Sequence, residues 1–272
     1  MADDAASQVE KAVTFALIAE AQPFRQFWQV AENGGRIVCV VHSMLLPVPP
    51  IYAGADGTPG LILPDSFAVT DAPEGTVEAL VEAAQAVQRE AGARIFLSSF
   101  VAGPDWRAAF DAKSYEPLTL YFSRSDLGDA GRPSDVRPAN EADVPGIVAR
   151  SAEIRSVLFG IDPFWAIHPE ADARFDAWTR RSLTLPDRDM LVMVDPEGLE
   201  GYVIAQPASR LHFPPAHNIT GTGVIDDFYH PDLADPNALA NAGVGSMALL
   251  RAAEAAFAER GTGAAFVVCP AG

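Results

Sequence analysis

The sequence predicts an α/β protein (α+β, with mixed sheets) in which one structural plan is used twice. The first observation is a repeat. The stretch from Val48 to Phe67 and the stretch from Phe213 to Tyr229 each precede a similar helix-like and strand-like run. The register of these runs is constant, with 170 residues between the members of three matched pairs: Gly75 and Gly245, Leu80 and Leu250, Phe96 and Phe266. The second observation is the alternation of strands and helices in both halves.

Each half is predicted to contain a strand hairpin, a third strand, a helix that begins at glycine and a fourth strand. The hairpins are FWQVAENGGRIVCVV and MLVMVDPEGLEGYVIA, in which two apolar runs flank a turn that contains glycine. Both helices carry apolar residues at helical spacing, as expected for packing on a core. These residues are Val77, Leu80, Ala84 and Val87 in the first helix, and Met247, Leu250, Ala253 and Phe257 in the second.

The second half has an additional front end, SDVRPANEADVPGIVAR. This stretch predicts a short strand and then a helix, with Asn140 as the N-cap and Asp143 in the first turn. The apolar residues Val144, Ile147 and Val148 then fall on one helix face. A further helix is predicted over residues 163–182.

The polar stretch 125–134, which contains Gly and Pro, is predicted to be the linker between a domain of residues 1–124 and a domain of residues 135–272. In the alignment of the two halves, the second ends before the last helix and strand of the first. Native proteins avoid unpaired sheet edges. We therefore expect either residues beyond 272 in the natural protein or a neighbouring segment that covers this edge.

Composition and charge exclude several classes of function. The formal net charge of −17 argues against a nucleic-acid partner, because clustered Lys and Arg hold phosphate backbones. The same charge is compatible with a cationic substrate such as an amine, and also with solubility alone. No apolar run approaches the roughly 18 residues of a membrane helix, and the acidic start is unlike a secretory signal. Cys39 and Cys269 lie in apolar runs, which is typical of buried thiols and not of a metal site. We expect a cytoplasmic protein, and a homodimer is compatible with the sequence.

The segment NAGVGS, residues 241–246, places two glycines at the start of a helix. Glycine lets the backbone approach a ligand, and the free N–H groups of the first turn favour a phosphate. The run GVGSMA also satisfies the dinucleotide motif G-x-G-x-x-G/A. That motif needs a strand running directly into the first glycine and an acidic residue about 20 positions later. Neither is present, so a nicotinamide site is excluded. A helix that merely begins at glycine is the alternative.

These segments, in this order, resemble the GCN5-related N-acetyltransferases. DVRPANEADVPGIV resembles the opening strand and helix of that family, and MLVMVDPEGLEGYVIA its central hairpin. GVIDDFYHPDL, followed by AGVGSMALLRAAEAAFAERG, resembles the strand and helix that hold acetyl-CoA. The family's phosphate motif is Arg or Gln, two residues, Gly, one residue, and Gly or Ala. Gly243 and Gly245 fit it, whereas Ala240 stands in place of the Arg or Gln. The resemblance covers residues 135–269 and, more faintly, 26–124. It implies an acyl-CoA N-acyltransferase-like fold in two tandem units.

The resemblance implies an N-acetyltransferase that moves an acetyl group from acetyl-CoA to the amine of a small molecule. It places the cosubstrate against nine residues: Phe228, Tyr229, His230, Asn241, Ala242, Gly243, Val244, Gly245 and Ser246. The amine must attack unprotonated, so a base is needed. Asp226 and Asp227 are the candidates, with His230 as a further one. The alternative is that one aspartate is a strand-end hydrogen-bonding residue, that the other faces solvent, and that the histidine belongs to a turn.

The two halves differ at the helix start. Where the second half has Gly243 and Val244, the first has Pro73 and Glu74. Proline has no N–H to donate, and a glutamate would bring negative charge beside a pyrophosphate. The cosubstrate is therefore expected in the C-terminal copy, with a degenerate N-terminal copy. The competing hypothesis is a non-catalytic CoA-binding or structural protein.

Overall fold

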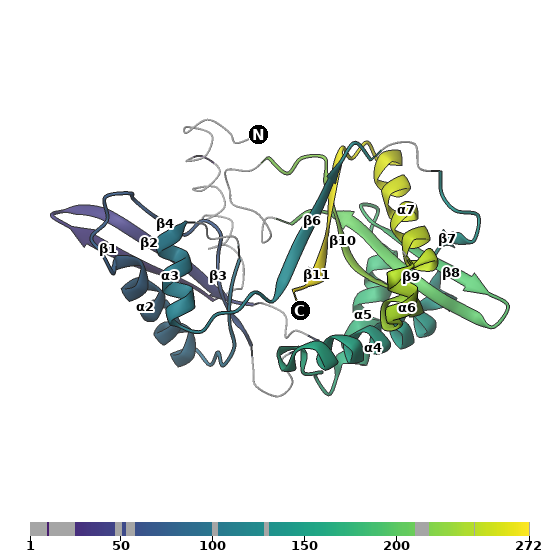
Figure 1. The fold of residues 1–272 in the computed structure, drawn as a ribbon, viewed down its shortest axis with the longest axis horizontal. Coiled ribbons are helices and arrows are strands. Elements are labelled where there is room, and N and C mark those ends of the chain that lie inside the picture. The colour runs from purple at the N-terminus through teal and green to yellow at the C-terminus, as the bar shows by residue number, and fades with distance from the viewer. Residues whose placement is uncertain are drawn as a thin grey trace. The chain divides into compact units, whose positions relative to one another are not determined.

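The fold is described from a computed structural model, whose described residues fall into two compact units (Figure 1). One unit lies within residues 1–117 and 209–219, and the other within 118–208 and 220–272. The described residues are 10, 25–46, 51–52, 58–99, 103–127, 131–209, 218–241 and 243–271.

The first unit contains a five-stranded sheet with the order β1-β2-β3-β5 and with β4 paired to β2. Its elements are β1 (Gln26–Asn33), β2 (Arg36–Leu45), β3 (Gly60–Ile62), β4 (Phe67–Ala68), α2 (Thr76–Glu90), β5 (Phe96–Ser98) and α3 (Pro104–Ala112). The predicted hairpin is β1 and β2. The predicted strand–helix–strand run is β3, α2 and β5, in which the two strands are parallel. Both helices contribute to one core: Cys39, Val41, Ile62, Val77, Leu80, Val81, Ala84, Trp106 and Ala109.

The second unit contains a six-stranded mixed sheet with the order β6-β11-β10-β9-β8-β7. Its strands are β6 (Thr119–Ser125), β7 (Val136–Pro138), β8 (Asp189–Asp195), β9 (Gly198–Pro207), β10 (Thr222–Tyr229) and β11 (Ala264–Pro270). Its α-helices are α4 (Val144–Ile161), α5 (Ala171–Leu183), α6 (Pro236–Ala240) and α7 (Val244–Glu259). Its short 3-10 turns are η1 (Glu141–Asp143), η2 (Pro163–Trp165) and η4 (Pro231–Ala234).

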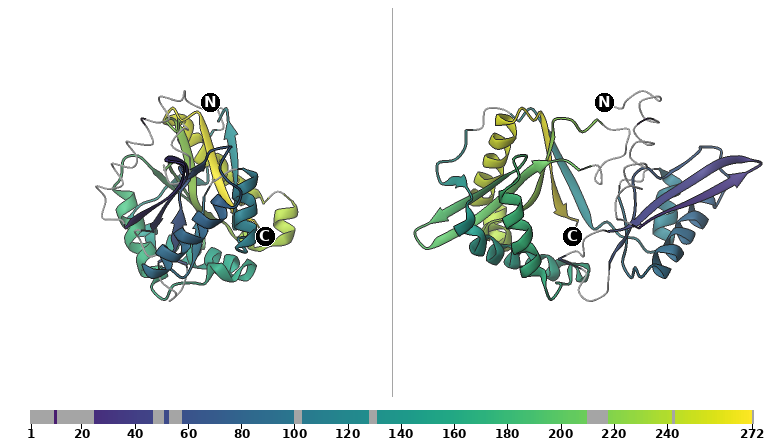
Figure 2. Two further views of the ribbon diagram at one scale, coloured as in Figure 1. Left: turned by 90° about the vertical axis from the view of Figure 1, so that its left-hand side faces the viewer. Right: turned by 180° about the vertical axis from the view of Figure 1, so that it is seen from behind.

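Strand alternation directs the two faces of this sheet to different helices (Figure 2). Val203 and Ala205 of β9 belong to the core formed with α7. Tyr202, which points to the opposite face, packs near Phe175 of α5, with their ring centroids 6.4 Å apart. Helix α7 therefore covers one face, and α4 and α5 cover the other.

The predicted start of the front-end helix is confirmed. The Asn140 side chain accepts a hydrogen bond from the Ala142 N–H at 2.9 Å, and the Asp143 carboxylate accepts one from the Asn140 N–H at 2.8 Å. This reciprocal capping box satisfies donors that a helix start leaves without partners. The turn η1 follows it, and α4 begins at Val144.

Strand β6 belongs to the second unit. It pairs antiparallel with β11 from Ser125, opposite Ala264, to Thr119, opposite Pro270. Leu127, which follows it, is 4% exposed in the core of this unit. The stretch predicted as a linker, 125–134, therefore connects two strands of the same sheet, and the units divide before Leu118. Of the two alternatives for the open sheet edge, a neighbouring segment is the one observed.

Helices α2 and α7 begin at different points of the repeat. The glycine with a left-handed backbone is Gly75, with φ 79°, before α2, and Gly243, with φ 49°, before α7. Helix α7 thus starts two residues earlier. Its buried face contains Leu249, whereas the predicted Met247 is 40% exposed. Because α7 is rich in alanine, several of its faces are apolar, and spacing alone did not identify the buried one.

The two cysteines are free thiols. Cys39 is fully buried, and burial raises the pKa of its thiol to about 11, whereas Cys269 on β11 is partly buried. Among the described residues, no group of three or more His, Cys, Asp or Glu side chains could hold a metal ion. Likewise, no helix in the described part of the chain is long and apolar enough to cross a membrane.

Candidate active site

Strand β10 contains a β-bulge at Asp226. On β9, Ala205 pairs with Ile225 and the next residue, Ile204, pairs with Asp227, so Asp226 is the extra residue. The parallel pairing with β11 also ends at Ile225. A bulge bends and twists a strand, so β10 separates from β11 from this point onward. The sheet therefore opens between the central strands β10 and β11, and Asp226 and Asp227 lie at this opening.

Asp226 is the bulged residue of β10. Its side chain is exposed to water, yet burial by the surrounding protein raises the pKa of its carboxyl, and the nearby Arg188 partly opposes this effect. Both features suit a group that meets a ligand arriving from solvent.

Asp227 is held by Tyr202, whose hydroxyl donates a hydrogen bond to the Asp227 carboxylate at 2.7 Å. Burial raises the pKa of Asp227 to about 6. The Tyr202 hydrogen bond and the positive charge of Arg155 lower it, and the neighbouring Asp226 raises it further. A carboxylate with this pKa is ionised at pH 7 and still accepts a proton readily, as general-base catalysis requires.

Arg155 brings a buried positive charge to this region from α4. It is fully buried, and its Nη1 donates to the Ser151 hydroxyl at 2.7 Å. Its Nη2 pairs with Asp172 of α5, and its guanidinium lies 5.8 Å from the ring centroid of Phe175. Ser151 and Arg155 are one helical turn apart, so α4 presents both on one face. Two helices, α4 and α5, therefore fix the positive charge of Arg155, which lowers the pKa of Asp227 and so opposes the effect of burial.

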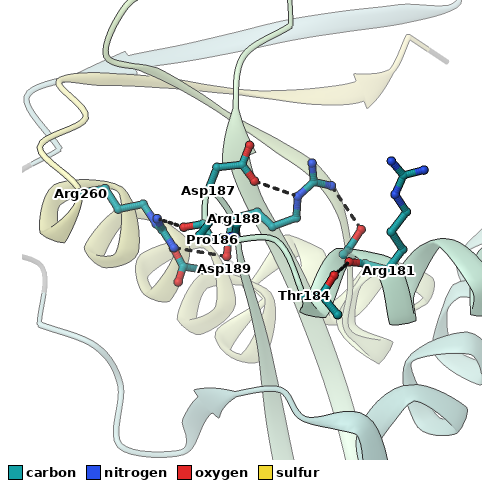
Figure 3. A network of polar contacts seen from close by, with 8 residues as sticks. Arg181, Thr184, Pro186, Asp187, Arg188, Asp189 and Arg260 are labelled. Carbon is teal, nitrogen blue, oxygen red and sulfur yellow. Dashed lines mark hydrogen bonds and ion pairs between the residues drawn. The ribbon is translucent and has the colours of Figure 1, made fainter.

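The loop between α5 and β8 fixes Arg188 (Figure 3). The positive charge of Arg188 lowers the pKa of Asp226 and so opposes the effect of burial. Arg260, at the end of α7, donates to the Pro186 carbonyl at 2.7 Å. Arg188 itself donates to the Ser182 hydroxyl at 3.2 Å. Its side chain is 16% exposed, so this guanidinium is held at a defined place and does not move freely in solvent.

The predicted phosphate loop lies at the start of α7. Gly243 caps the helix, and the N–H groups of Gly245 and Ser246 both point to one acceptor. That acceptor is an oxygen of the Asp232 carboxylate, at 2.8 Å from the Gly245 nitrogen and 3.1 Å from the Ser246 nitrogen. Two backbone donors therefore converge on one point at this helix start, and an acidic side chain of the same unit accepts from both. Asn241 and Val244 are exposed, and Ala242 lies outside the described residues.

Two further features fit a pyrophosphate at this helix start. The Ser246 hydroxyl is buried, and within the described residues it has no hydrogen-bond partner. Gly245 packs against the ring of His230 so closely that a Cβ would lie 2.1 Å from Nε2. The loop thus combines free donor capacity with a glycine that no other residue replaces without a clash. These residues fit CoA, provided that the Asp232 carboxylate moves aside.

Of the remaining predicted cosubstrate residues, Phe228 and Tyr229 lie on β10 after the bulge, and His230 directly follows the strand. Phe228 packs against the α7 core, and Tyr229, opposite Tyr202 on β9, is 3% exposed. Burial raises the pKa of the Tyr229 hydroxyl to about 12. His230 is buried, and its Nδ1 accepts a hydrogen bond from the Asp232 N–H at 3.2 Å.

Four residues of this region were not predicted from the sequence: Arg155, Arg188, Tyr202 and Asp232. Each acts through a contact between elements that are distant in the chain, which spacing does not report. The HPD run was a usable local signal for Asp232, because His and Asp around a proline are common at turns. That signal predicts a turn and does not predict the contact with α7.

No family model matches the chain, and no curated protein resembles it in sequence. Solved structures do resemble it. A GCN5-related N-acetyltransferase from Sphaerobacter thermophilus matches with 13% identity and a TM-score of 0.58, over 94% of this chain and 76% of that one. A tandem GNAT protein from the clavulanic acid biosynthesis pathway matches with 14% identity and a TM-score of 0.50, over 100% of this chain and 89% of that one. The chain has the acyl-CoA N-acyltransferase fold. A GCN5-related N-acetyltransferase from Kribbella flavida matches with 14% identity and a TM-score of 0.44, and the chain spans 57% of its length.

Proposed function

We propose that this protein transfers an acetyl group from acetyl-CoA to the amine of a small molecule, with the cosubstrate held by the C-terminal unit. The observation that carries the proposal is the opening of the sheet between β10 and β11 at the bulge of Asp226 and Asp227. On an acyltransferase fold, this opening combines a place for a thioester with carboxylates that can accept a proton.

Binding is assigned to the strand–loop–helix run of β10 and α7. The N–H groups of Gly245 and Ser246, with the Ser246 hydroxyl, would hold the pyrophosphate, because charge-assisted hydrogen bonds to backbone N–H groups are strong. Phe228, Tyr229 and His230 would line the pantetheine arm. Bound acetyl-CoA supplies an acyl thioester that is open to attack by an amine.

Proton transfer is assigned to the two aspartates, with different roles. Asp226 is accessible and would attract a protonated amine from solvent. Asp227 is partly buried, is held by Tyr202 and has a pKa near 6, so it would take the proton that the amine must lose. Arg155 keeps Asp227 from becoming more basic. The negative charge of Asp226 raises the pKa of Asp227 and so makes it a better proton acceptor.

The N-terminal unit is proposed to be a degenerate copy that leaves acetyl-CoA to its neighbour. Its β3, α2 and β5 follow the same plan, and β3 is parallel to β5. The residues ahead of α2 are Pro73, which lacks an N–H, and Glu74, which would repel a pyrophosphate. We therefore expect one acetyl-CoA per chain.

A second candidate function is a non-catalytic one, either weak CoA binding or a structural role. The observation that favours it is the carboxylate of Asp232 on the very N–H groups that a pyrophosphate needs. Ala240, at the position of the expected Arg or Gln, removes a further phosphate contact. Both features weaken cosubstrate binding and suit a protein under little demand for turnover.

The release of free CoA thiol from acetyl-CoA, measured with a panel of small amines, tests the proposal. We expect turnover with at least one amine, and a fall of about 10²–10⁴-fold in the Asp227→Asn variant, which removes the base. Saturable CoA binding by calorimetry with no turnover for any amine would favour the second candidate. Absence of both binding and turnover would refute the proposed function.

A further inference from the structure

The carboxylate of Asp232 occupies the place of a ligand at the start of α7. One of its oxygens accepts hydrogen bonds from two successive backbone N–H groups, those of Gly245 and Ser246. The side chain is 18% exposed, so the contact is largely shielded from water. Hydrogen bonds to a charged acceptor, placed at the positive end of a helix of 16 residues, are among the stronger polar contacts in proteins. A bound anion would have to break them.

The start of α7 offers more hydrogen-bonding groups than the Asp232 carboxylate uses. The Ser246 hydroxyl is buried in the first turn of α7, and among the described residues nothing accepts from it or donates to it. A Cβ built at Gly243 would lie 3.4 Å from the Asp232 carboxylate oxygen, so the loop passes close to it. A pyrophosphate offers several acceptor oxygens, whereas the carboxylate leaves this donor unused. We call the N–H groups of Gly245 and Ser246, together with the Ser246 hydroxyl, the α7 cradle. The Asp232 carboxylate satisfies only part of this cradle.

Asp232 is tied to the residues proposed to line the pantetheine arm. Its N–H donates to His230 Nδ1 at 3.2 Å, and its carboxylate lies 3.2 Å from the same nitrogen. The His230 ring packs on Gly245, and its Nε2 lies 3.1 Å from a Glu200 oxygen. His230, which directly follows β10, the turn η4 and the start of α7 thus meet at this carboxylate. Its position is defined by these contacts, so it is not a mobile surface charge.

We propose that Asp232 is an internal competitor of the cosubstrate, which closes the α7 cradle until a pyrophosphate displaces its carboxylate. This inference rests on the proposed function, since it names a regulation of that site. The apparent affinity for acetyl-CoA is then the affinity of the open form multiplied by the fraction of molecules that are open. Anything that draws Asp232 away from α7 raises the affinity for acetyl-CoA without adding a contact to it.

Calorimetric titration of acetyl-CoA into the full chain tests this proposal with the Asp232→Asn variant. The substitution removes the charge and keeps the size of the side chain. We expect binding to become about tenfold tighter, which is the gain when the cradle is closed in about nine molecules of ten. Inorganic pyrophosphate, titrated in parallel, should show the same direction, because it probes the cradle alone.

The matched control is Asp235→Asn. Asp235 lies three residues further along, and its carboxylate accepts from the Asn237 N–H of α6 at 2.9 Å. Both variants lose one negative charge from an acidic chain, so long-range repulsion changes equally in both. Only a direct contact with the cradle separates them. The amide resonances of Gly245 and Ser246, followed by NMR, should move in Asp232→Asn without ligand and stay in place in Asp235→Asn.

The outcomes separate the inference from the proposed function. Tighter binding by Asp232→Asn than by Asp235→Asn supports the inference, including the case in which the unmodified chain shows no measurable binding. If the unmodified chain binds acetyl-CoA and Asp232→Asn binds no more tightly, the inference is overturned and the proposed function stands. Absence of binding in all three chains overturns both. Binding that leaves the Gly245 and Ser246 resonances unmoved overturns the inference, since the carboxylate then stays in place.

Discussion

Helices α2 and α7 occupy the same place in the repeated plan and are capped in different ways. Both begin at a glycine with a left-handed backbone, Gly75 and Gly243. Helix α7 starts two residues earlier, and its first N–H groups bind the Asp232 carboxylate. In the described part of the chain, no side chain caps α2.

This difference shows that a helix beginning at glycine does not by itself form a binding site. Residues from other elements must also lie at the helix start. Around α7, the strand with the bulge supplies Asp226 and Asp227, and the following turn supplies Asp232. In the first unit, His42 is a fully buried polar group on the sheet, paired with Asp65 at 2.8 Å and stacked on Trp28. That pair is satisfied internally, whereas the second unit keeps carboxylates whose burial raises their pKa. Buried groups with perturbed pKa values are more common at functional sites.

The largest expected effect concerns the sheet edge of the second unit. Its sheet is completed by β6, which pairs with β11 along seven residues. A chain that begins at residue 131 lacks this strand and exposes the edge of β11, so we expect it to aggregate or to unfold without cooperativity. A chain that begins at Leu118 retains the strand and should unfold in one cooperative transition, monitored by circular dichroism. Equal stability of the two chains would contradict the assignment of β6.

The second effect concerns Asp227, and it has opposite signs for stability and activity. Burial raises its folded-state pKa to about 6, above the unfolded value. The free energy of unfolding therefore falls as pH rises from about 4 to about 6, where the folded state retains a proton that the unfolded state has lost. Asp227→Asn should be more stable than the unmodified chain by about 1–3 kcal/mol at pH 7, and equally stable near pH 3.

Urea unfolding at the two pH values measures this difference, while CoA release measures the expected loss of turnover. The matched control is Asp71→Asn in the first unit. The ion pair with Arg36 lowers the pKa of this exposed carboxyl, so the substitution should leave turnover unchanged and should not stabilise the chain. Lower stability of Asp227→Asn at pH 7 would contradict the account.

The third effect concerns the contact between Gly245 and His230. A Cβ at Gly245 would lie 2.1 Å from the histidine Nε2, so Gly245→Ala should destabilise the chain by about 1–3 kcal/mol through overpacking. In the double variant with His230→Ala, the ring is gone and the clash should disappear. Denaturant unfolding of the four chains gives the coupling energy. An additive result would mean that the ring and the glycine do not meet.

The smallest effect concerns the hydrogen bond from Tyr202 to Asp227. This bond lowers the pKa of Asp227, so Tyr202→Phe should move the acid limb of the pH–rate profile to higher pH. We expect a loss of several-fold in rate near pH 6 and a smaller loss at pH 8. Tyr115→Phe in the first unit removes a hydroxyl of a partly buried tyrosine, which accepts from Gln85, and should leave the profile unchanged. A uniform loss at all pH values would assign Tyr202 to packing alone.

Local features of the fold were predictable because local chemistry determines them. The capping box of Asn140 and Asp143 follows from side chains within one helical turn. The hairpins, and the strands that flank α2 and α7, follow from apolar runs and turn residues. The partner of β6 was not predictable, because an alternating pattern identifies a strand and leaves its neighbour open.

The site divides in the same way. The acidic pair and the glycine loop were visible as motifs. The contacts of Asp227 with Tyr202, and of Asp232 with α7, join residues that the fold alone brings together. The bulge that separates Asp226 from the ladder has no sequence signature, because no glycine marks it.

The most direct test of the central claim, that the start of α7 holds one acetyl-CoA per chain, is a calorimetric titration of acetyl-CoA into three chains. They are the unmodified protein, Val244→Glu and the matched first-unit variant Glu74→Val. Val244 is 82% exposed in the first turn, so a glutamate fits there and suits the helix dipole. We expect one site per chain. Affinity for acetyl-CoA should be about tenfold lower in Val244→Glu, because the introduced carboxylate repels the pyrophosphate, which carries more negative charge than the Asp232 carboxylate that it displaces. Glu74→Val should bind as the unmodified chain does. Unchanged affinity in Val244→Glu, or a second site per chain, would contradict the claim.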